Sequence, residues 1–140
     1  MPSIFTRILD GELPGHKVWQ DELCFSIMTI QPIREGHLLV IPREEINHWD
    51  EVPEAVAAHL MKVSQIIARA MKQVIDCRRI GVSIIGLEVP HTHIHLIPID
   101  SMADMDFANS GTTEAGQLEA VAEKIRAALK QAGYAGADLP

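Results

Sequence analysis

The centre of the chain carries the clearest pattern of apolar and polar positions. Apolar side chains recur there at spacings of three or four residues: Val56, Leu60, Val63, Ile67, Ala70 and Val74. Such spacing places them on one face of an α-helix, which turns once every 3.6 residues. Pro53, just before the repeat, suits the first turn of a helix. The pattern therefore predicts a helix of about 20 residues with one buried face.

Shorter patterns on both sides of this helix predict the other elements. A short helix with Ser3 as its N-cap is expected at 3–10, and an amphipathic helix at about 113–132. Apolar or alternating runs predict five strands, at 17–20, 23–30, 37–41, 80–87 and 91–97. About five strands with one long packing helix indicate an α+β domain.

The strand expected at 91–97 carries an alternating row of histidines: His91, His93 and His95. Successive side chains of a strand point to opposite faces, so the three imidazoles would share one face. The other face would turn toward the core with Thr92, Ile94 and Leu96. Pro90 and Pro98 at either end argue against a helix.

Length and composition fit one globular domain spanning residues 1–140. The net charge is −7 and the sequence contains no basic run, so we expect neither nucleic-acid nor membrane binding. Cys24 and Cys77 have no disulfide-framework or metal-like spacing, which favours a reducing cytoplasm. No apolar run approaches the ~20 residues that a bilayer-spanning helix needs. A cytoplasmic protein is the simplest expectation.

A row of imidazoles suits three kinds of site, because imidazole titrates near neutral pH with a reference pKa of ~6.5. It could bind a metal ion, but residues i and i+4 of a strand lie ~13 Å apart and the sequence offers no paired cysteines. It could be a half-exposed strand without chemistry, which strict alternation disfavours. It could also place a nucleophilic imidazole between phosphate-binding neighbours. His37, which follows Gly36 before an apolar strand, would add a donor to such a site.

Several stretches of the sequence resemble the histidine-triad (HIT) superfamily. Segment 91–97 has the family's His-φ-His-φ-His-φ-φ motif, where φ is an apolar residue and Thr92 stands at the first φ. Further stretches agree in order and spacing: 3–8 with 11–14, 36–42 and 86–90. The similarity covers roughly residues 3–100 and resembles a Hint-like bacterial branch that lacks the zinc-site cysteines.

This resemblance implies a fold and an activity. The fold would be a five-stranded antiparallel sheet with one long helix and a C-terminal helix, paired in a homodimer with a continuous ten-stranded sheet. The activity would be hydrolysis or transfer at the α-phosphate of purine nucleoside phosphoramidates or adenylates, through a nucleotidyl-histidine intermediate. Two alternatives stay open: a dinucleoside polyphosphate hydrolase, and a nucleotide-binding regulatory protein with little activity.

The resemblance also assigns roles to individual residues. His93 would be the nucleophile, and His95 and His37 would contact the phosphate. His91 would orient the site, partly through its backbone carbonyl. The family positions that hold base and ribose correspond here to Ile4, Phe5, Ile8, Ile27, Thr29 and Ile30.

Some positions depart from the family pattern. Where many bacterial relatives have zinc ligands, this chain has Ser3, Thr6 and Glu45, so no structural zinc is expected, and no other metal or cofactor. Thr29 replaces the usual acidic ribose-binding residue, which would weaken recognition of the ribose hydroxyls. Leu87 replaces a usually polar residue, which would remove a contact to the leaving group or the phosphate.

Overall fold

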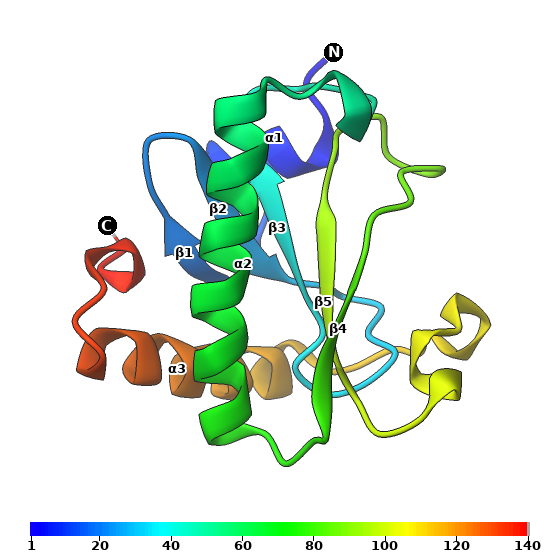
Figure 1. Cartoon of the computed structure of the whole chain (residues 1–140), viewed down its shortest axis with the longest axis vertical. Coiled ribbons are helices and arrows are strands. Elements are labelled where there is room, and N and C mark those ends of the chain that lie inside the picture. The colour runs from blue at the N-terminus through cyan, green and yellow to red at the C-terminus, as the bar shows by residue number, and fades with distance from the viewer. Residues whose placement is uncertain (140) are drawn as a thin grey trace.

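The computed structural model describes residues 1–139, so Pro140, the last residue of the expected domain, lies outside the described residues. Figure 1 shows the elements in chain order: α1 (Ile4–Leu9), β1 (Lys17–Gln20), β2 (Cys24–Met28), β3 (Leu38–Pro42), η1 (Trp49–Glu51), α2 (Glu54–Val74), β4 (Arg79–Ser83), β5 (Ile94–Ile99), η2 (Met102–Met105), η3 (Phe107–Asn109), α3 (Ala115–Gln131) and η4 (Ala135–Ala137). The η elements are short 3₁₀ helices. The strands, the long α2 and the C-terminal α3 confirm the predicted α+β fold.

The strands form a five-stranded antiparallel sheet in the order β1-β2-β3-β5-β4. β2 and β3 are buried along their whole length, as their nearly continuous apolar sequences predict for central strands. β1 and β4 form the two edges of the sheet. Among residues 1–139, the structure has no helix with the length and apolar character needed to span a membrane.

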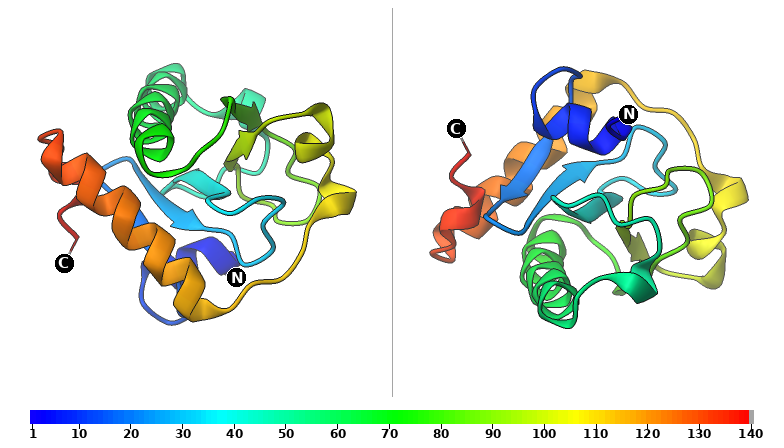
Figure 2. Two further views of the ribbon diagram at one scale, coloured as in Figure 1. Left: turned by 90° about the horizontal axis from the view of Figure 1, so that it is seen from below. Right: turned by 90° about the horizontal axis from the view of Figure 1, so that it is seen from above.

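Different helices cover the two faces of the sheet, and Figure 2 shows α1 and α2 on opposite sides of the central strands. α2 and α3 pack together on one face, where Val40, Leu96 and Ile67 belong to the larger apolar core. On the other face, Phe5 of α1 packs with Ile41 in a smaller apolar cluster. A cavity beside α1 lies on this face, and it is the candidate site.

The predicted helix ends are close to those in the structure. α1 begins after Ser3, whose Oγ accepts a hydrogen bond from Thr6 N at 3.2 Å, as an N-cap should. α2 begins after Pro53 and buries the predicted face, including Leu60 and Ile67. Both helices are therefore fixed by local signals in the sequence.

The predicted histidine strand is wrong at its beginning, because β5 starts only at Ile94. The preceding backbone bonds to a loop instead of to the sheet, with Thr92 N donating to Ile46 O at 2.8 Å. Ile94 and Leu96 still face the larger core as predicted. His91 and His93 therefore sit in an irregular lead-in, and His95 lies on the strand itself.

Two strand ends also differ from the prediction. Pro98, expected to end the histidine strand, lies inside β5, beyond Leu96 where pairing with β3 stops, and its register partner is Ile80 of β4. β4 ends at Ser83, whose register partner is His95, so the predicted strand at 80–87 is too long. Segment 84–90 leaves the sheet and becomes part of the wall of the candidate site.

Gly36 fixes the entry into β3. Its φ is +95°, and a Cβ at this position would lie 2.2 Å from Cδ1 of Ile75. Glycine alone tolerates both the backbone conformation and the close approach. The turn places His37 directly before β3 on the α1 side of the sheet.

Candidate active site

A cavity of about 520 Å³ lies beside α1. Its walls come from segments far apart in the sequence: α1, residues 29–31, residues 37–39, loop 85–89, the region around His93 and His95, and η3 with Ser110. Among the described residues that line it, Glu88 is the only carboxylate, and there is no lysine or arginine. An anion in this cavity would therefore be held by neutral donors, above all by imidazole N–H groups.

His93 presents an unprotonated nitrogen to this cavity. Its Nδ1 lies 2.8 Å from the carbonyl oxygen of His91, and a carbonyl oxygen can only accept a hydrogen bond. The ring proton is therefore on Nδ1, and the lone pair is on Nε2. Phe5 packs edge-on against the ring, with the centroids 4.9 Å apart, and only 7% of His93 is exposed. The side chain is thus held in one tautomer and one orientation.

Two successive hydrogen bonds fix the tautomers of His37 and His95. His37 Nδ1 accepts a hydrogen bond from Ile33 N at 3.0 Å, so its proton is on Nε2. That Nε2–H lies 2.9 Å from His95 Nδ1 and donates to it. His95 must then carry its own proton on Nε2. The ring centroids of His93 and His95 are 4.9 Å apart. A ring with a free lone pair on Nε2, that of His93, thus lies next to a ring with an N–H donor at Nε2, that of His95.

His91 is a fully buried anchor with both ring nitrogens bonded. Its Nε2–H donates to Pro42 O at 2.7 Å, and its Nδ1 accepts from Ser3 Oγ at 2.6 Å. Ser3 N and Thr6 Oγ1 donate to the same oxygen of Glu45, at 2.5 and 2.6 Å. Ser3, Thr6, Glu45 and His91 are thus joined by hydrogen bonds, which tie α1 to the backbone that holds His93.

All four imidazoles of this region are held neutral. Burial lowers the pKa of His37 to about 4. Burial, with smaller contributions from the neighbouring His93 and His37, lowers the pKa of His95 to about 3. Burial also lowers the pKa of His91 and His93, although the hydrogen bond between His93 and the His91 carbonyl acts in the opposite direction. These shifts agree with the neutral tautomers that the contacts require.

The structure brings most of the expected site residues together. His93, His95 and His37 line the cavity, as do Ile4, Phe5, Thr29 and Ile30. His91 lies behind the wall and acts through its backbone. Two of the expected base and ribose residues stand apart from the lining: Ile8 and Ile27, which pack in the smaller apolar cluster beneath α1.

Several lining residues were not expected from the sequence. Phe107 of η3 packs edge-on against His95, with the ring centroids 4.7 Å apart, and Leu39, Ile85 and Val89 complete the apolar wall. Phe107 is a lone aromatic in a polar segment that reads as irregular, so its isolation is the one signal that could have identified it. The segment after β5 therefore does reach the site.

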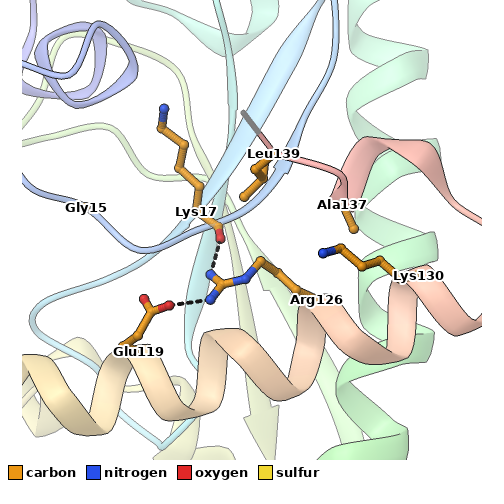
Figure 3. Close-up of a pocket in the computed structure, with 7 residues that line it drawn as sticks. All are labelled: Gly15, Lys17, Glu119, Arg126, Lys130, Ala137 and Leu139. Atoms are coloured by element: carbon orange, nitrogen blue, oxygen red, sulfur yellow. Dashed lines mark hydrogen bonds and ion pairs between the residues drawn. The ribbon is translucent and has the colours of Figure 1, made fainter.

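A second cavity, of about 390 Å³, lies between α3 and the start of β1 (Figure 3). Its central cation, Arg126, already has partners: Nη1 donates to Lys17 O at 2.6 Å, and Nη2 pairs with Glu119. A phosphate would have to compete with these contacts. The histidine-lined cavity is the better candidate for a phosphate-containing ligand.

Comparison with known proteins agrees with this geometry. The family model described as HIT domain matches residues 10–102. An uncharacterized HIT-like protein of Borreliella burgdorferi is 34% identical over 102 residues, which cover 68% of this chain and 73% of the relative. Adenosine 5'-monophosphoramidase HNT1 of Saccharomyces cerevisiae is 31% identical over 96 residues, which cover 68% of this chain and 61% of the relative.

A solved structure shares the fold. The crystal structure of a HIT-like protein from Bartonella henselae, described as involved in cell-cycle regulation, has a TM-score of 0.79 and 28% identity, covering 90% of this chain and 95% of that chain. The family model spans well over half of the present sequence, and the expected sheet and helices are in place. The chain belongs to the histidine-triad (HIT) family.

Proposed function

We propose that this protein is a nucleotide hydrolase or transferase that acts at the α-phosphate of purine nucleoside phosphoramidates or adenylates. The observation that carries the proposal is the pairing of His93 Nε2, a fixed lone pair, with His95 Nε2–H, a fixed donor, in one cavity. A nucleophile beside a preorganised donor is the arrangement that phosphoryl transfer requires. The yeast relative is named as an adenosine monophosphoramidase, which agrees with this class of substrate.

In the first step, His93 Nε2 forms a bond to the α-phosphorus while the bond from phosphorus to the leaving group breaks. The leaving amine or acid departs and takes any proton it needs from water. His95 Nε2–H donates to a non-bridging oxygen, where negative charge develops. The His93 ring becomes positively charged, and the His91 carbonyl stabilises that charge through the Nδ1–H bond.

In the second step, water attacks the phosphorus and the bond to His93 Nε2 breaks. A nucleoside monophosphate is released, and the proton lost by water passes to the solvent. His93 returns to its starting tautomer because the His91 carbonyl holds its Nδ1–H throughout. The nucleophile is thereby ready for another cycle without rotation of the ring.

The apolar cavity walls suit the flat ring face of a nucleobase. Ile4, Phe5, Ile30 and Leu39 supply apolar surface near the histidines, and the cavity volume of about 520 Å³ suits a mononucleotide. Thr29 lies at the same wall, and its Oγ1 accepts a hydrogen bond from Gln31 N at 3.3 Å. A threonine hydroxyl is a weaker acceptor for ribose hydroxyls than a carboxylate.

The experiment is turnover of adenosine phosphoramidate by the wild type and by His93→Ala, with His48→Gln as a matched control at an exposed histidine outside the cavity. We expect the wild type and the control to release AMP and His93→Ala to be inactive. Quenching the wild type early in the reaction should trap acid-labile label on the protein. Equal turnover by His93→Ala would overturn the proposal, as would a rate that EDTA abolishes while the protein stays folded.

A nucleotide-binding protein with little activity is the second candidate function. The observation that favours it is Leu87, which is 89% exposed at the mouth of the cavity where a polar contact to the leaving group is expected. Calorimetry would distinguish the two: tight AMP binding without turnover of phosphoramidate, adenylate or diadenosine polyphosphate favours binding alone. Faster turnover of diadenosine polyphosphate than of phosphoramidate would instead favour a dinucleoside polyphosphate hydrolase.

We also propose that two copies pair along β4 to give a continuous ten-stranded sheet. β4 is an edge strand, and its Val82 is 48% exposed. An edge strand offers unpaired backbone groups to a second strand. Analytical ultracentrifugation should give a dimer for the wild type and a weaker dimer for Val82→Lys, whereas a monomeric wild type would refute the pairing.

A further inference from the structure

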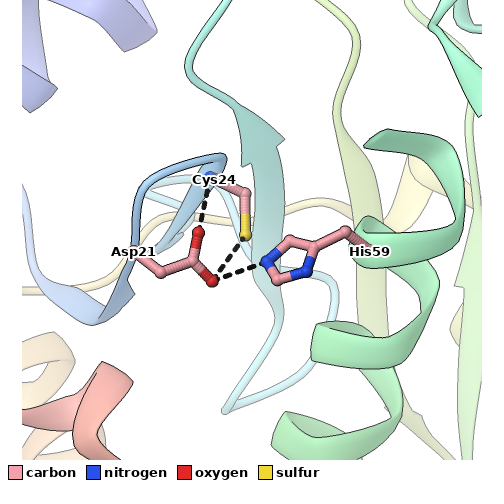
Figure 4. Close-up of side chains that lie close together, drawn as sticks. All are labelled: Asp21, Cys24 and His59. Atoms are coloured by element: carbon pink, nitrogen blue, oxygen red, sulfur yellow. Dashed lines mark hydrogen bonds and ion pairs between the residues drawn. The ribbon is translucent and has the colours of Figure 1, made fainter. Parts of the chain in front are cut away.

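A cluster of three metal-ligand side chains lies outside the histidine-lined cavity, where the β1–β2 turn meets α2. Asp21 comes from the turn, Cys24 from the start of β2 and His59 from α2, and Figure 4 shows the three pointing toward one another. Asp21 Oδ2 lies 2.7 Å from His59 Nε2 and 3.6 Å from Cys24 Sγ, and all three atoms lie within 4.8 Å of one another. Cys24 belongs to the larger core, so the cluster is on the opposite face of the sheet from the histidines.

We propose that Asp21, Cys24 and His59 form a binding site for a borderline-soft divalent transition metal, of which Zn²⁺ is the best match. The donor set is one carboxylate oxygen, one sulfur and one imidazole nitrogen. Zn²⁺ binds all three donor types and prefers four ligands in a tetrahedron. Ca²⁺ and Mg²⁺, which prefer oxygen ligands, would gain little from the sulfur and nitrogen.

The spacing of the donors is close to what a tetrahedral site needs. With zinc–ligand distances of ~2.0–2.3 Å, neighbouring donor atoms lie about 3.3–3.6 Å apart. The separation of Asp21 Oδ2 and Cys24 Sγ, 3.6 Å, already fits. The separation of Asp21 Oδ2 and His59 Nε2, 2.7 Å, must lengthen by about 0.6 Å. This adjustment falls to the side chain of His59, which is 27% exposed.

The carboxylate is already positioned and charged. Asp21 Oδ1 accepts from Leu23 N at 2.8 Å and from Cys24 N at 2.9 Å, and Trp19 Nε1 donates to Oδ2 at 2.8 Å. Burial would raise the pKa of Asp21, but these hydrogen bonds and that of His59 outweigh it and lower the pKa to about 2. Second-sphere hydrogen bonds of this kind orient metal ligands. The Trp19 bond can remain in place when His59 turns its lone pair to the metal.

Metal binding must release a proton from Cys24. Burial, followed by the nearby charge of Asp21, raises the pKa of this thiol well above its usual range, so it is protonated without a metal. Binding replaces the S–H proton with a metal–sulfur bond, and the proton goes to solvent. The ring proton of His59 then lies on Nδ1, and Nε2 bonds to the metal.

The site has room for a fourth ligand on its outer side. The side chains of His59 and Asp21 are 27% and 23% exposed, whereas Cys24 is fully buried. A metal held by three protein atoms would therefore face solvent, and water is the natural fourth ligand. Because the ligands come from the β1–β2 turn and from α2, the metal would join the sheet to its covering helix.

The test uses Co²⁺ as the probe, because a cysteine thiolate bound to Co²⁺ gives a charge-transfer absorption band that histidine and carboxylate ligands do not give. The full-length protein is titrated as wild type, Cys24→Ala, His59→Gln and Cys77→Ser. Cys77→Ser is the matched control, since Cys77 is the other free cysteine and lies outside the cluster. The same proteins are heated with and without Zn²⁺.

We expect one Co²⁺ per chain with a thiolate band in the wild type and in Cys77→Ser, and competition of Zn²⁺ with that band. Cys24→Ala should lose the band, and His59→Gln should bind at least about tenfold more weakly. Zn²⁺ should raise the melting temperature of the wild type but not of Cys24→Ala. If Cys24→Ala fails to fold, His59→Gln decides, because its side chain is partly exposed. A wild type without the band, or a band that survives in both cluster variants, would overturn the proposal.

Discussion

His37 Nε2 lies 2.9 Å from Nδ1 of His95, and this contact determines where the proton of His95 points. This series of hydrogen bonds starts at the backbone N–H of Ile33. It donates to His37 Nδ1, so the ring proton of His37 is on Nε2. His37 is therefore a positioning residue for His95 as well as a part of the cavity wall. Such outer partners typically contribute 10–100-fold to activity.

His37→Ala should accordingly lower kcat for adenosine phosphoramidate by roughly 10–100-fold, because His95 can then place its proton on either nitrogen. His37→Gln keeps a side-chain donor and should recover part of the loss. The measurement is steady-state kinetics, with His48→Gln as the control for a histidine outside the cavity. A normal kcat in His37→Ala would show that His95 does not depend on this contact.

Ser3→Ala should affect both stability and activity. The change removes the N-cap of α1 and leaves the buried His91 Nδ1 without its donor. Together these losses should lower the free energy of unfolding by about 1–3 kcal/mol. Ser3→Thr retains a hydroxyl and is the matched control.

The same variants test whether His91 is held by α1. Because the His91 carbonyl fixes His93, kcat should fall in Ser3→Ala while KM for the nucleotide changes less. Urea unfolding and steady-state kinetics provide the two measurements. Equal stability of Ser3→Ala and Ser3→Thr would argue that the Ser3–His91 contact contributes nothing.

The buried histidines should make the fold sensitive to mild acid. An unfolded histidine binds a proton near pH ~6.5, whereas His37 and His95 in the folded protein do so only near pH 4 and pH 3. The contribution of these neutral rings to the free energy of unfolding is thus fully present above pH ~6.5. It is lost as pH falls toward the pKa values of the two rings in the folded protein. For His37 the whole window corresponds to roughly 3 kcal/mol.

Urea unfolding at pH 7, 6 and 5 stays above the range in which most carboxylates titrate and so isolates this effect. The midpoint should fall steadily across the three conditions. His37→Asn should have a shallower dependence, since one low-pKa group is gone. A flat profile in the wild type would contradict the low pKa values of the buried imidazoles.

Thr29→Asp should strengthen recognition of ribose. The side chain lies at the cavity wall, and a carboxylate accepts hydrogen bonds from hydroxyls more strongly than a threonine does. AMP should bind roughly tenfold more tightly to the variant. Calorimetry with 2′,3′-dideoxy-AMP is the control, and an equal gain for that ligand would rule out a ribose contact.

Sequence patterns predicted the scaffold well because its signals are local. The apolar repeat of α2 and the cap at Ser3 each depend on residues within a few turns of one another. The start of β5 was mispredicted because Thr92 bonds to Ile46, a partner that alternation cannot reveal. The tautomers depend on similarly distant partners, such as Pro42 for His91.

The lining of the cavity was only partly accessible from the sequence for the same reason. Ile8 and Ile4 are both apolar residues of one short helix, yet Ile4 lines the cavity and Ile8 packs beneath it. Phe107 reaches His95 through a chain of 3₁₀ turns with no strong periodicity. The sequence likewise shows no metal-ligand spacing that would join Asp21 to His59, because the two side chains meet only when α2 packs on the sheet.

The burial of His37 and His91 has a consequence for how folding itself can be observed. Their hydrogen-bond partners, including Ile33 N and Pro42 O, come from separate stretches of chain, so these environments exist only when the whole fold is assembled. In an unfolded chain the imidazoles of His37 and His91 have the reference pKa of ~6.5 again. The proton resonances of the His37 and His91 rings would therefore report the folded fraction directly. A molecule in which these two rings titrate near pH ~6.5 has lost the contacts that hold His93 in place.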